Sequence, residues 1–398
     1  MRRRNVGGLA GLAAVVTLAV AVALAPGTSG AAGDAAGGPP VAATWSAVLA
    51  GARGQTVRWW MYGGDQRIND YVDSRVAPAA ARLGVRLVRV AITDTAAAVQ
   101  RVIAQRQAGR TSGGAVDLIW INGENFAAGK QAGLWLKQWS TTLPNARYVD
   151  WGSAAIARDL QVPVVGQESP WSSAAFVFAY DSARVARPPR TLAALLAWAK
   201  AHPGRFTYPA PPDFTGSAFV RQVVQRLASR ARAIAFLKAL RPYQYDGGRS
   251  FPQSQAELDR LFGDGQVGFA MSYDPSFVSA GVRKGAFPHT ARPFLIGGGA
   301  LVNTSYVTIP ADAAHRDGAL VVANLLLDPR LQAIKADPAV LGVPTVLDLS
   351  RLDQAQRRLF DRSSGSPYLL PDFGAPLSEL SAFEVGPIEQ QWLREVLR

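Results

Sequence analysis

The sequence is 398 residues long and contains no cysteine and only three histidines. Without cysteine the chain has no disulfide, no thiolate zinc site, no cysteine nucleophile and no lipid-carrying cysteine of a lipoprotein. His202, His289 and His315 lie far apart and match no metal-ligand spacing such as H-x-x-x-H. We therefore expect no metal and no cofactor.

Two enzyme motifs are missing as well, the P-loop and the G-x-S-x-G elbow, so nucleotide hydrolases and serine hydrolases have no support. Gly263, Gly265 and Gly268 have the spacing of the dinucleotide-binding fingerprint G-x-G-x-x-G, but not its structural context. A helix is predicted before these glycines, over 256–262, and a strand after them, which is the reverse of what the fingerprint requires. We interpret them as a helix C-cap and a turn.

Charged residues make up 18% of the chain and hydrophobic residues 48%, a balance that favours a buried core over intrinsic disorder. The formal net charge is +13, but the arginines are scattered singly, without a dense basic run or interleaved aromatics. We expect an arginine-rich, solvated surface and no nucleic-acid partner.

The N-terminus begins with Met1 and three arginines, continues with an apolar run over 6–25 and reaches small residues near Ala31. This layout is typical of a secretory signal, so we predict a signal peptide over 1–31 and export to the periplasm. An uncleaved membrane anchor is the alternative, because a run of about 20 apolar residues can also span a bilayer. Residues 32–44 are mostly Gly, Ala and Pro and are predicted to be a disordered spacer.

From residue 55 onward, strand and helix patterns alternate. Strands are predicted over 55–62, 85–90 and 116–121, with helices over 69–83 and 95–108 between them. Such alternation predicts an α/β fold with a mostly parallel sheet flanked by helices. Ligands collect at the carboxyl ends of parallel strands, which here carry the polar segments 63–65 and 122–126.

Further along, strands are predicted over 174–180, 205–208 and 267–272. The strand at 205–208 runs into an irregular loop and a helix that starts near Ala218, so the exposed amides at Thr215 and Ser217 can bind an anion or a carbonyl oxygen. Tyr273 and Asp274 follow the strand at 267–272, so we expect them to open onto a ligand cleft and to face Asp65 and Glu124 across it. Acids on both sides favour a cationic or polyhydroxyl solute, unless arginines of the protein neutralise them.

Short segments in a characteristic order resemble the type 2 periplasmic binding proteins of ABC importers. They are DLIW at 117–120, FAYD at 178–181, PPRTL at 188–192, YP at 208–209, LFGDGQVGFAM at 261–271 and NLLLDP at 324–329. Within this family, YGGD at 62–65, INGENF at 121–126 and ESPW at 168–171 are most similar to the YnjB-type branch. The resemblance covers most of residues 55–345.

The resemblance implies a two-lobed periplasmic-binding-protein type II fold, each lobe a mostly parallel sheet flanked by helices, with crossing hinge strands near 176–180 and 300–309. Lobe 1 is expected over 45–177 and 303–398, with C-terminal helices able to pack on both lobes, and lobe 2 over 178–302. The solute would lie between the lobes, and the monomeric protein would deliver it to an inner-membrane ABC permease.

Several side chains are candidates for solute contact because they follow strands or carry an aromatic ring that can stack on a ring or cation. The predicted set is Gly64, Asp65, Asn122, Glu124, Asn125, Trp171, Tyr208, Thr215, Ser217, Tyr273 and Asp274. The leading hypothesis is a non-catalytic receptor for a small polar solute, with thiamine-like cations and polyamines first. The alternatives are an exported hydrolase or lyase that uses carboxylates such as Asp65 and Glu124 as acid and base, and a solute-sensing module.

Overall fold

The computed structural model of the protein describes residues 44–361, 366–370 and 372–398. The predicted signal peptide over 1–31 lies outside the described residues, as does the predicted spacer up to residue 43. No helix in the described ranges combines the length and the apolar character that crossing a membrane requires.

The first sheet has six strands in the order β11-β10-β3-β1-β2, and β6 also pairs with β10. Its strands are β1 (Thr56–Tyr62), β2 (Arg86–Ile92), β3 (Leu118–Ile121), β6 (Glu168–Ala175), β10 (Leu301–Thr308) and β11 (Leu377–Ser378). β1 pairs in parallel with both β2 and β3, which confirms the parallel core predicted from the alternating pattern. β10 runs antiparallel to β3 and β6.

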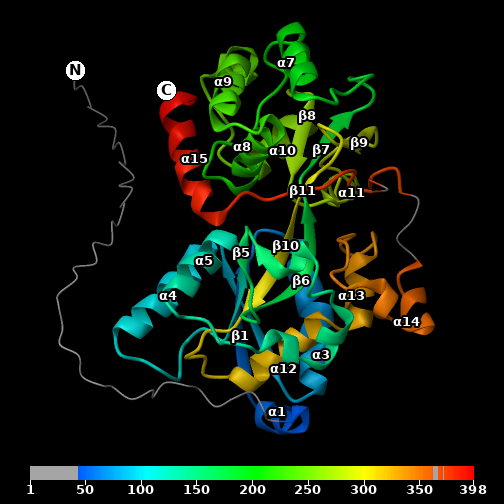
Figure 1. Ribbon diagram of the computed structural model, residues 1–398. Helices are drawn as coiled ribbons and strands as arrows, with labels where there is room; N and C mark the ends of the chain where they lie inside the picture. The colour runs from blue at the N-terminus through cyan, green and yellow to red at the C-terminus, as the bar shows by residue number, and fades with distance from the viewer. Residues whose placement is uncertain (1–43, 362–365, 371) are drawn as a thin grey trace, which may run out of the picture. The chain divides into compact units, whose positions relative to one another are not determined.

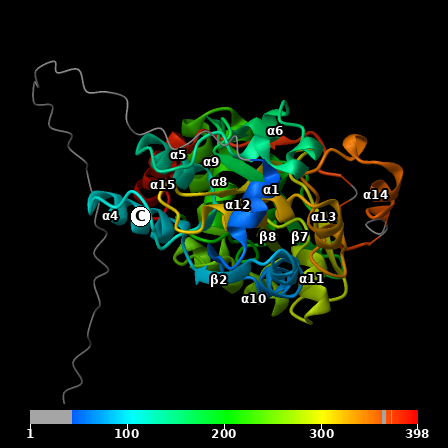
Figure 2. The same cartoon turned by 90° about the horizontal axis from the view of Figure 1, so that it is seen from below.

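Helices flank this sheet because alternate side chains of its strands are apolar and have to be shielded from water. In β1 the side chains of Val57, Trp59 and Met61 are buried, whereas Arg58 and Tyr62 are exposed. The covering helices are α1 (Trp45–Ala52), α2 (Gln66–Tyr71), a π-helix (Val72–Val76), α3 (Ala77–Arg82), α4 (Thr95–Gln107), α5 (Gly123–Gln131), α6 (Ala154–Ala157), α12 (Arg316–Leu326) and α13 (Pro329–Ala336). Figure 2 shows α1 lying against α12, in agreement with their extensive contacts.

The second sheet has three strands in the order β8-β7-β9. They are β7 (Val177–Asp181), β8 (Phe269–Ser272) and β9 (Ala291–Phe294). Both pairings are antiparallel, in contrast to the mostly parallel second sheet that was expected. β8 and β9 do run in the same direction with α11 between them, but β7 enters from the first sheet and occupies the place between the two.

The helices of the second lobe gather around this sheet, as Figure 1 shows for α7 to α10. They are α7 (Leu192–Ala201), α8 (Phe214–Leu227), α9 (Arg230–Leu240), α10 (Gln255–Gly263) and α11 (Phe277–Arg283). Two further helices follow near the C-terminus, α14 (Gln354–Arg358) and α15 (Ala382–Glu395). A short hairpin, β4 (Arg158–Asp159) with β5 (Val162–Pro163), completes the regular elements apart from single 3-10 turns.

The end of α10 confirms the interpretation of the three glycines. Gly265 has φ +69°, its amide donates to Phe262, and the amide of Gln266 donates to Leu261. This pair of hydrogen bonds is the Schellman motif, in which a left-handed residue ends the helix. Strand β8 then begins at Phe269, so the segment is a helix end and not a nucleotide loop.

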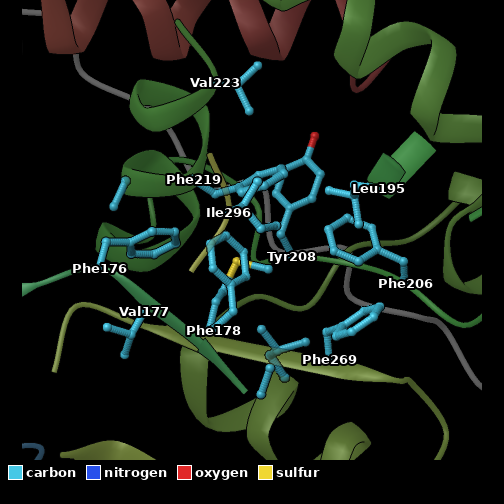
Figure 3. Close-up of a cluster of buried hydrophobic side chains, with 14 of the residues drawn as sticks. Phe176, Val177, Phe178, Leu195, Phe206, Tyr208, Phe219, Val223, Phe269 and Ile296 are labelled. Atoms are coloured by element: carbon cyan, nitrogen blue, oxygen red, sulfur yellow. The ribbon is translucent and has the colours of Figure 1, made fainter. Parts of the chain in front are cut away.

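Each lobe has its own apolar interior. The second-lobe core is rich in aromatic rings, and Figure 3 shows Phe178, Phe206, Tyr208 and Phe219 packed together. Tyr208 lies 4.6 Å from Phe219 between ring centroids, and its hydroxyl accepts a hydrogen bond from Trp392 of α15 at 2.9 Å. Helix α15 therefore closes the second-lobe core, although it contacts α5 of the first lobe as well.

Two predicted strands differ from the structure. Residues 205–208 form no strand, because they enter the buried core as an extended segment that leads to α8. The strand predicted over 174–180 is divided at Phe176 into the end of β6 and the start of β7, which belong to different sheets. The chain crosses between the sheets at this residue and again just before β10, while the limits of the two lobes stay a prediction.

We expect Tyr208→Phe to lower the free energy of unfolding by about 1–3 kcal/mol, because it leaves the buried indole N–H of Trp392 without its acceptor. Tyr180→Phe is the matched control in the same lobe, since the structure gives that hydroxyl no hydrogen bond within the described residues. Urea unfolding of both variants measures the difference, and equal losses would contradict the assignment.

Candidate functional site

The loop after β1 presents two of the predicted site residues, Gly64 and Asp65. A Cβ at Gly64 would lie 2.2 Å from the Tyr62 hydroxyl, so only glycine lets the tyrosine ring fold over the loop. Asp65 caps α2, with its carboxylate accepting from the Arg67 amide at 2.9 Å. The helix-capping role of this aspartate is thus realised in the structure.

Arg67 joins the two lobes through their carboxylates. Its guanidinium lies 2.6 Å from Asp65 of the first lobe and 2.5 Å from Asp274 of the second, and it donates to Ser276 at 2.9 Å. Burial disfavours the charged guanidinium, but Asp274 and Asp65 outweigh this, and the pKa of Arg67 is raised. These two acids were expected to face a cationic solute, and the structure instead gives them an arginine of the protein.

The segment at 122–126 is a helix terminus rather than the predicted loop, because α5 begins at Gly123. Asn125 is buried and donates to the Asn122 side chain at 2.7 Å, so these two amides bind each other. Glu124 has no hydrogen bond or ion pair within the described residues and is exposed to solvent. Its pKa is nevertheless raised, chiefly by desolvation from the surrounding protein and then by the charge of Glu389.

The N-terminus of α8 is already capped. Asp213 accepts from the amides of Thr215 and Gly216, both at 3.0 Å, which removes the donors expected to bind an anion. The Thr215 hydroxyl donates to Gln255 at 2.8 Å, and Ser217 donates to Glu389 at 2.5 Å. Asp213 therefore occupies two amides of this helix start, while solute contact by Thr215 and Ser217 stays a prediction.

A buried ion pair lies behind this surface. Arg221 of α8 donates to both oxygens of Glu379, at 2.9 and 3.1 Å, and both side chains are almost completely buried. The hydroxyl of Tyr273 donates to the same carboxylate at 2.7 Å. The pKa of Tyr273 is raised well above its ordinary value by burial and by the charge of Glu379. Tyr273 is thus held by hydrogen bonding rather than free to stack on a solute.

The other two predicted aromatic contacts belong to the cores. Trp171 is 1% exposed and packs edge-on against Trp120 and Trp59, at 4.9 and 5.7 Å between ring centroids. Tyr208 is fully buried in the second-lobe core. Both rings are buried, Trp171 among Trp59, Trp120 and Lys335 and Tyr208 against α15, and we omit both from the candidate site.

Two exposed aromatic residues that the sequence analysis did not single out complete the candidate site. Tyr62 is 46% exposed and Phe214 is 43% exposed, which is unusual for rings at the end of β1 and the start of α8. The pKa of Tyr62 is raised by burial, then by Asp65 and by Asp213, so the ring of the first lobe lies within electrostatic range of a second-lobe acid. Side chains alternate between buried and exposed along β1, and Tyr62 is on the exposed side. This alternation is a signal in the sequence that could have identified it.

Three carboxylates of the second lobe and of α15 form no ion pair within the described residues. The pKa values of Asp213 and Glu389 are raised, in each case first by burial. Asp259 of α10 reaches a pKa of about 7, raised by burial and by the nearby Asp274 and Asp213. Each of these acids would gain stability from a cation beside it.

Residues 44–361, 366–370 and 372–398 contain no cluster of three or more His, Asp or Glu side chains that could hold a metal ion. His315 contacts Asp117 at 3.2 Å, and His202 stacks on Trp198 with a centroid separation of 4.6 Å. These histidines have structural roles in capping and packing.

Comparison with known proteins agrees with this architecture. Residues 74–356 match the family described as bacterial extracellular solute-binding protein, and the chain belongs to this family. Such proteins are the substrate-binding components of ABC transporters and deliver ligand to a permease, and they are not a family of enzymes.

Among curated relatives, the chain is 39% identical over 369 residues to Protein YnjB of Escherichia coli (strain K12), which covers 88% of this chain and 94% of that protein. Among solved structures, a periplasmic thiamin binding protein has a TM-score of 0.59 at 16% identity, covering 86% of this chain and 96% of that one. AfuA of Actinobacillus pleuropneumoniae, with fructose-6-phosphate bound, has a TM-score of 0.60 at 11% identity, covering 86% and 98%. The predicted two-lobed binding-protein fold is confirmed.

We expect Arg67→Gln to favour separation of the lobes, because it leaves Asp65 and Asp274 facing each other without their shared cation. Each charged hydrogen bond contributes about 1.5–3 kcal/mol, enough to change the balance of open and closed forms at least about tenfold. Small-angle X-ray scattering of the solute-free protein should therefore give a larger radius of gyration. Arg89→Gln, which breaks a pair with Asp73 inside the first lobe, is the control and should leave it unchanged.

Proposed function

We propose that the protein binds a small organic cation between its lobes and delivers it to an ABC permease. The observation that carries the proposal is a set of carboxylates from both sides of the candidate site, Glu124, Asp213 and Glu389, that form no ion pair within the described residues, although Arg221 acts on Glu124 and Glu389 from a greater distance. A bound cation would replace the water that these acids lose on closure. The raised pKa values support this, because each acid is costly to ionise without a positive charge nearby.

The exposed rings support a cation of some apolar character. Tyr62 and Phe214 are half-exposed on opposite lobes, and a ring face attracts a cation, more strongly where water is excluded. Thiamine-like cations and polyamines combine positive charge with apolar surface and come first among the solutes. The solved relatives carry solutes as unlike as thiamin and fructose-6-phosphate, so the proposal rests on the side chains and not on the fold.

The proposal is tested by titrating thiamine, putrescine and spermidine into the purified protein, with neutral sugars, amino acids and ferric complexes for comparison. A cation that binds the folded state should stabilise it by about 2.7 kcal/mol at a concentration one hundred times its Kd. Isothermal titration then gives the affinity. Binding of a neutral sugar or a ferric complex, with none of the cations bound, would overturn the proposal.

Asp213→Asn isolates the charge in the same titration. Asparagine caps helices as well as aspartate does, so α8 should stay intact while the affinity for the cation falls at least about tenfold. Asp328→Asn is the matched control, since Asp328 caps α13 in the same way through the amides of Arg330 and Leu331. The control should bind the cation as the unchanged protein does.

The affinity for the cation should rise with pH between about 6 and 8. Asp259, with its pKa of about 7, is protonated below this range and attracts a cation only once it ionises. In the solute-free protein the raised pKa of Asp259 has the opposite effect on stability. The free energy of unfolding decreases as the pH rises through about 7, because the carboxylate then becomes charged without a cation beside it. Asp259→Asn should flatten both profiles, and a variant that retains them would show that another group titrates.

A further inference from the structure

A cavity of about 350 Å³ lies beside Arg67, and among the described residues its lining includes neither Tyr62 nor Phe214. Its walls come from α2 and the π-helix of the first lobe, from the end of α11 in the second lobe, and from Ala339 and Val340. We call it the basic cavity. Its volume falls in the range of small-molecule sites, about 300–1,000 Å³.

Four cations line the basic cavity, Arg67, Arg75, Arg283 and Lys284, against one carboxylate, Asp70. Arg67 is neutralised by Asp65 and Asp274, and Asp70 accepts a hydrogen bond from Gln66 at 2.7 Å. The other three cations form no ion pair with the described residues, and Arg283 donates only to the carbonyl of Pro338. The cavity therefore holds positive charge in excess, in a chain whose candidate solute site is rich in acids.

Local backbone geometry contributes to this wall. Pro78 lacks the amide that would donate to Ser74 in a regular helix, and the preceding turn, Val72–Val76, is a π-helix. Such turns are rare and occur frequently at functional sites. This one holds Ser74 and Arg75 in the wall that faces Arg283 and Lys284 of the other lobe.

We propose that the basic cavity binds a phosphate group, which links Arg75 of the first lobe to Arg283 and Lys284 of the second. Arginine and lysine form charge-assisted hydrogen bonds to phosphate oxygens, and Arg75 and Lys284 have donors that no carboxylate occupies. Because the lining comes from both lobes, the bound phosphate favours their closed arrangement. The phosphate is either a free ion or a group of the solute itself, and Arg67, which lines this cavity, also pairs with Asp65 and Asp274.

The test is isothermal titration of inorganic phosphate into the full-length protein at fixed ionic strength, with chloride as the reference salt. We expect phosphate to bind more tightly than chloride at the same ionic strength. The affinity for phosphate should be at least about tenfold weaker in the double variant Arg75→Gln/Lys284→Gln. Arg82→Gln is the matched control, an exposed arginine of the neighbouring α3 outside the cavity, and should bind as the unchanged protein does. No binding beyond chloride, or an unchanged affinity in the double variant, overturns the proposal.

Thiamine and thiamine monophosphate distinguish the two sources. If the affinity for thiamine monophosphate falls at least about tenfold in the double variant while the affinity for thiamine is unchanged, the phosphate group belongs to the solute. If inorganic phosphate and thiamine bind at the same time and only the affinity for phosphate falls, the phosphate is a separate ion. Either result supports the cavity. Asp213→Asn should leave inorganic phosphate binding unchanged, so a protein that binds phosphate but no cation would reject the proposed function alone.

Discussion

The antiparallel pairing of β6 with β10 is the constraint on which the rest of the structure depends. It runs from Ala175 opposite Val302 to Glu168 opposite Thr308, and each strand connects directly to a part of the second lobe. Glu168 and Asp159 lie fully buried beneath it. Burial raises the pKa of both acids, and then Glu379 and Glu124 raise that of Asp159 and Asp159 raises that of Glu168, so their charged forms are disfavoured where the strands are anchored.

The C-terminal segment reinforces this connection. β11 pairs in parallel with β10, and the next residue, Glu379, binds the buried Arg221 of the second lobe. The backbone of Glu379 also accepts from Gln161 of the first lobe. A buried ion pair gains little net stability after desolvation, but breaking it is costly, so it fixes one arrangement of the chain rather than adding much to its strength.

Arg67 connects two features of opposite charge. It pairs with Asp65 and Asp274, and it also lines the basic cavity, where Arg75, Arg283 and Lys284 form no ion pair with the described residues. Arg67 holds the two lobes through these two acids, so lobe closure and the charge of the basic cavity both depend on one guanidinium. This arrangement fits a receptor whose closed form is stabilised by what it binds.

Local sequence determined the parallel strands β1, β2 and β3 and the α/β class, because hydrophobic periodicity and turn residues act within a few positions of the chain. The helix end at Gly265 and the capping by Thr191 of α7 were predictable for the same reason. Tertiary structure alone decided that β7 enters between β8 and β9, that Tyr208 and Trp171 belong to cores, and that Arg67 neutralises Asp274, 207 positions away. The partners of a charge or a ring are set by segments that meet only when the lobes fold, and no local pattern encodes which segments those are.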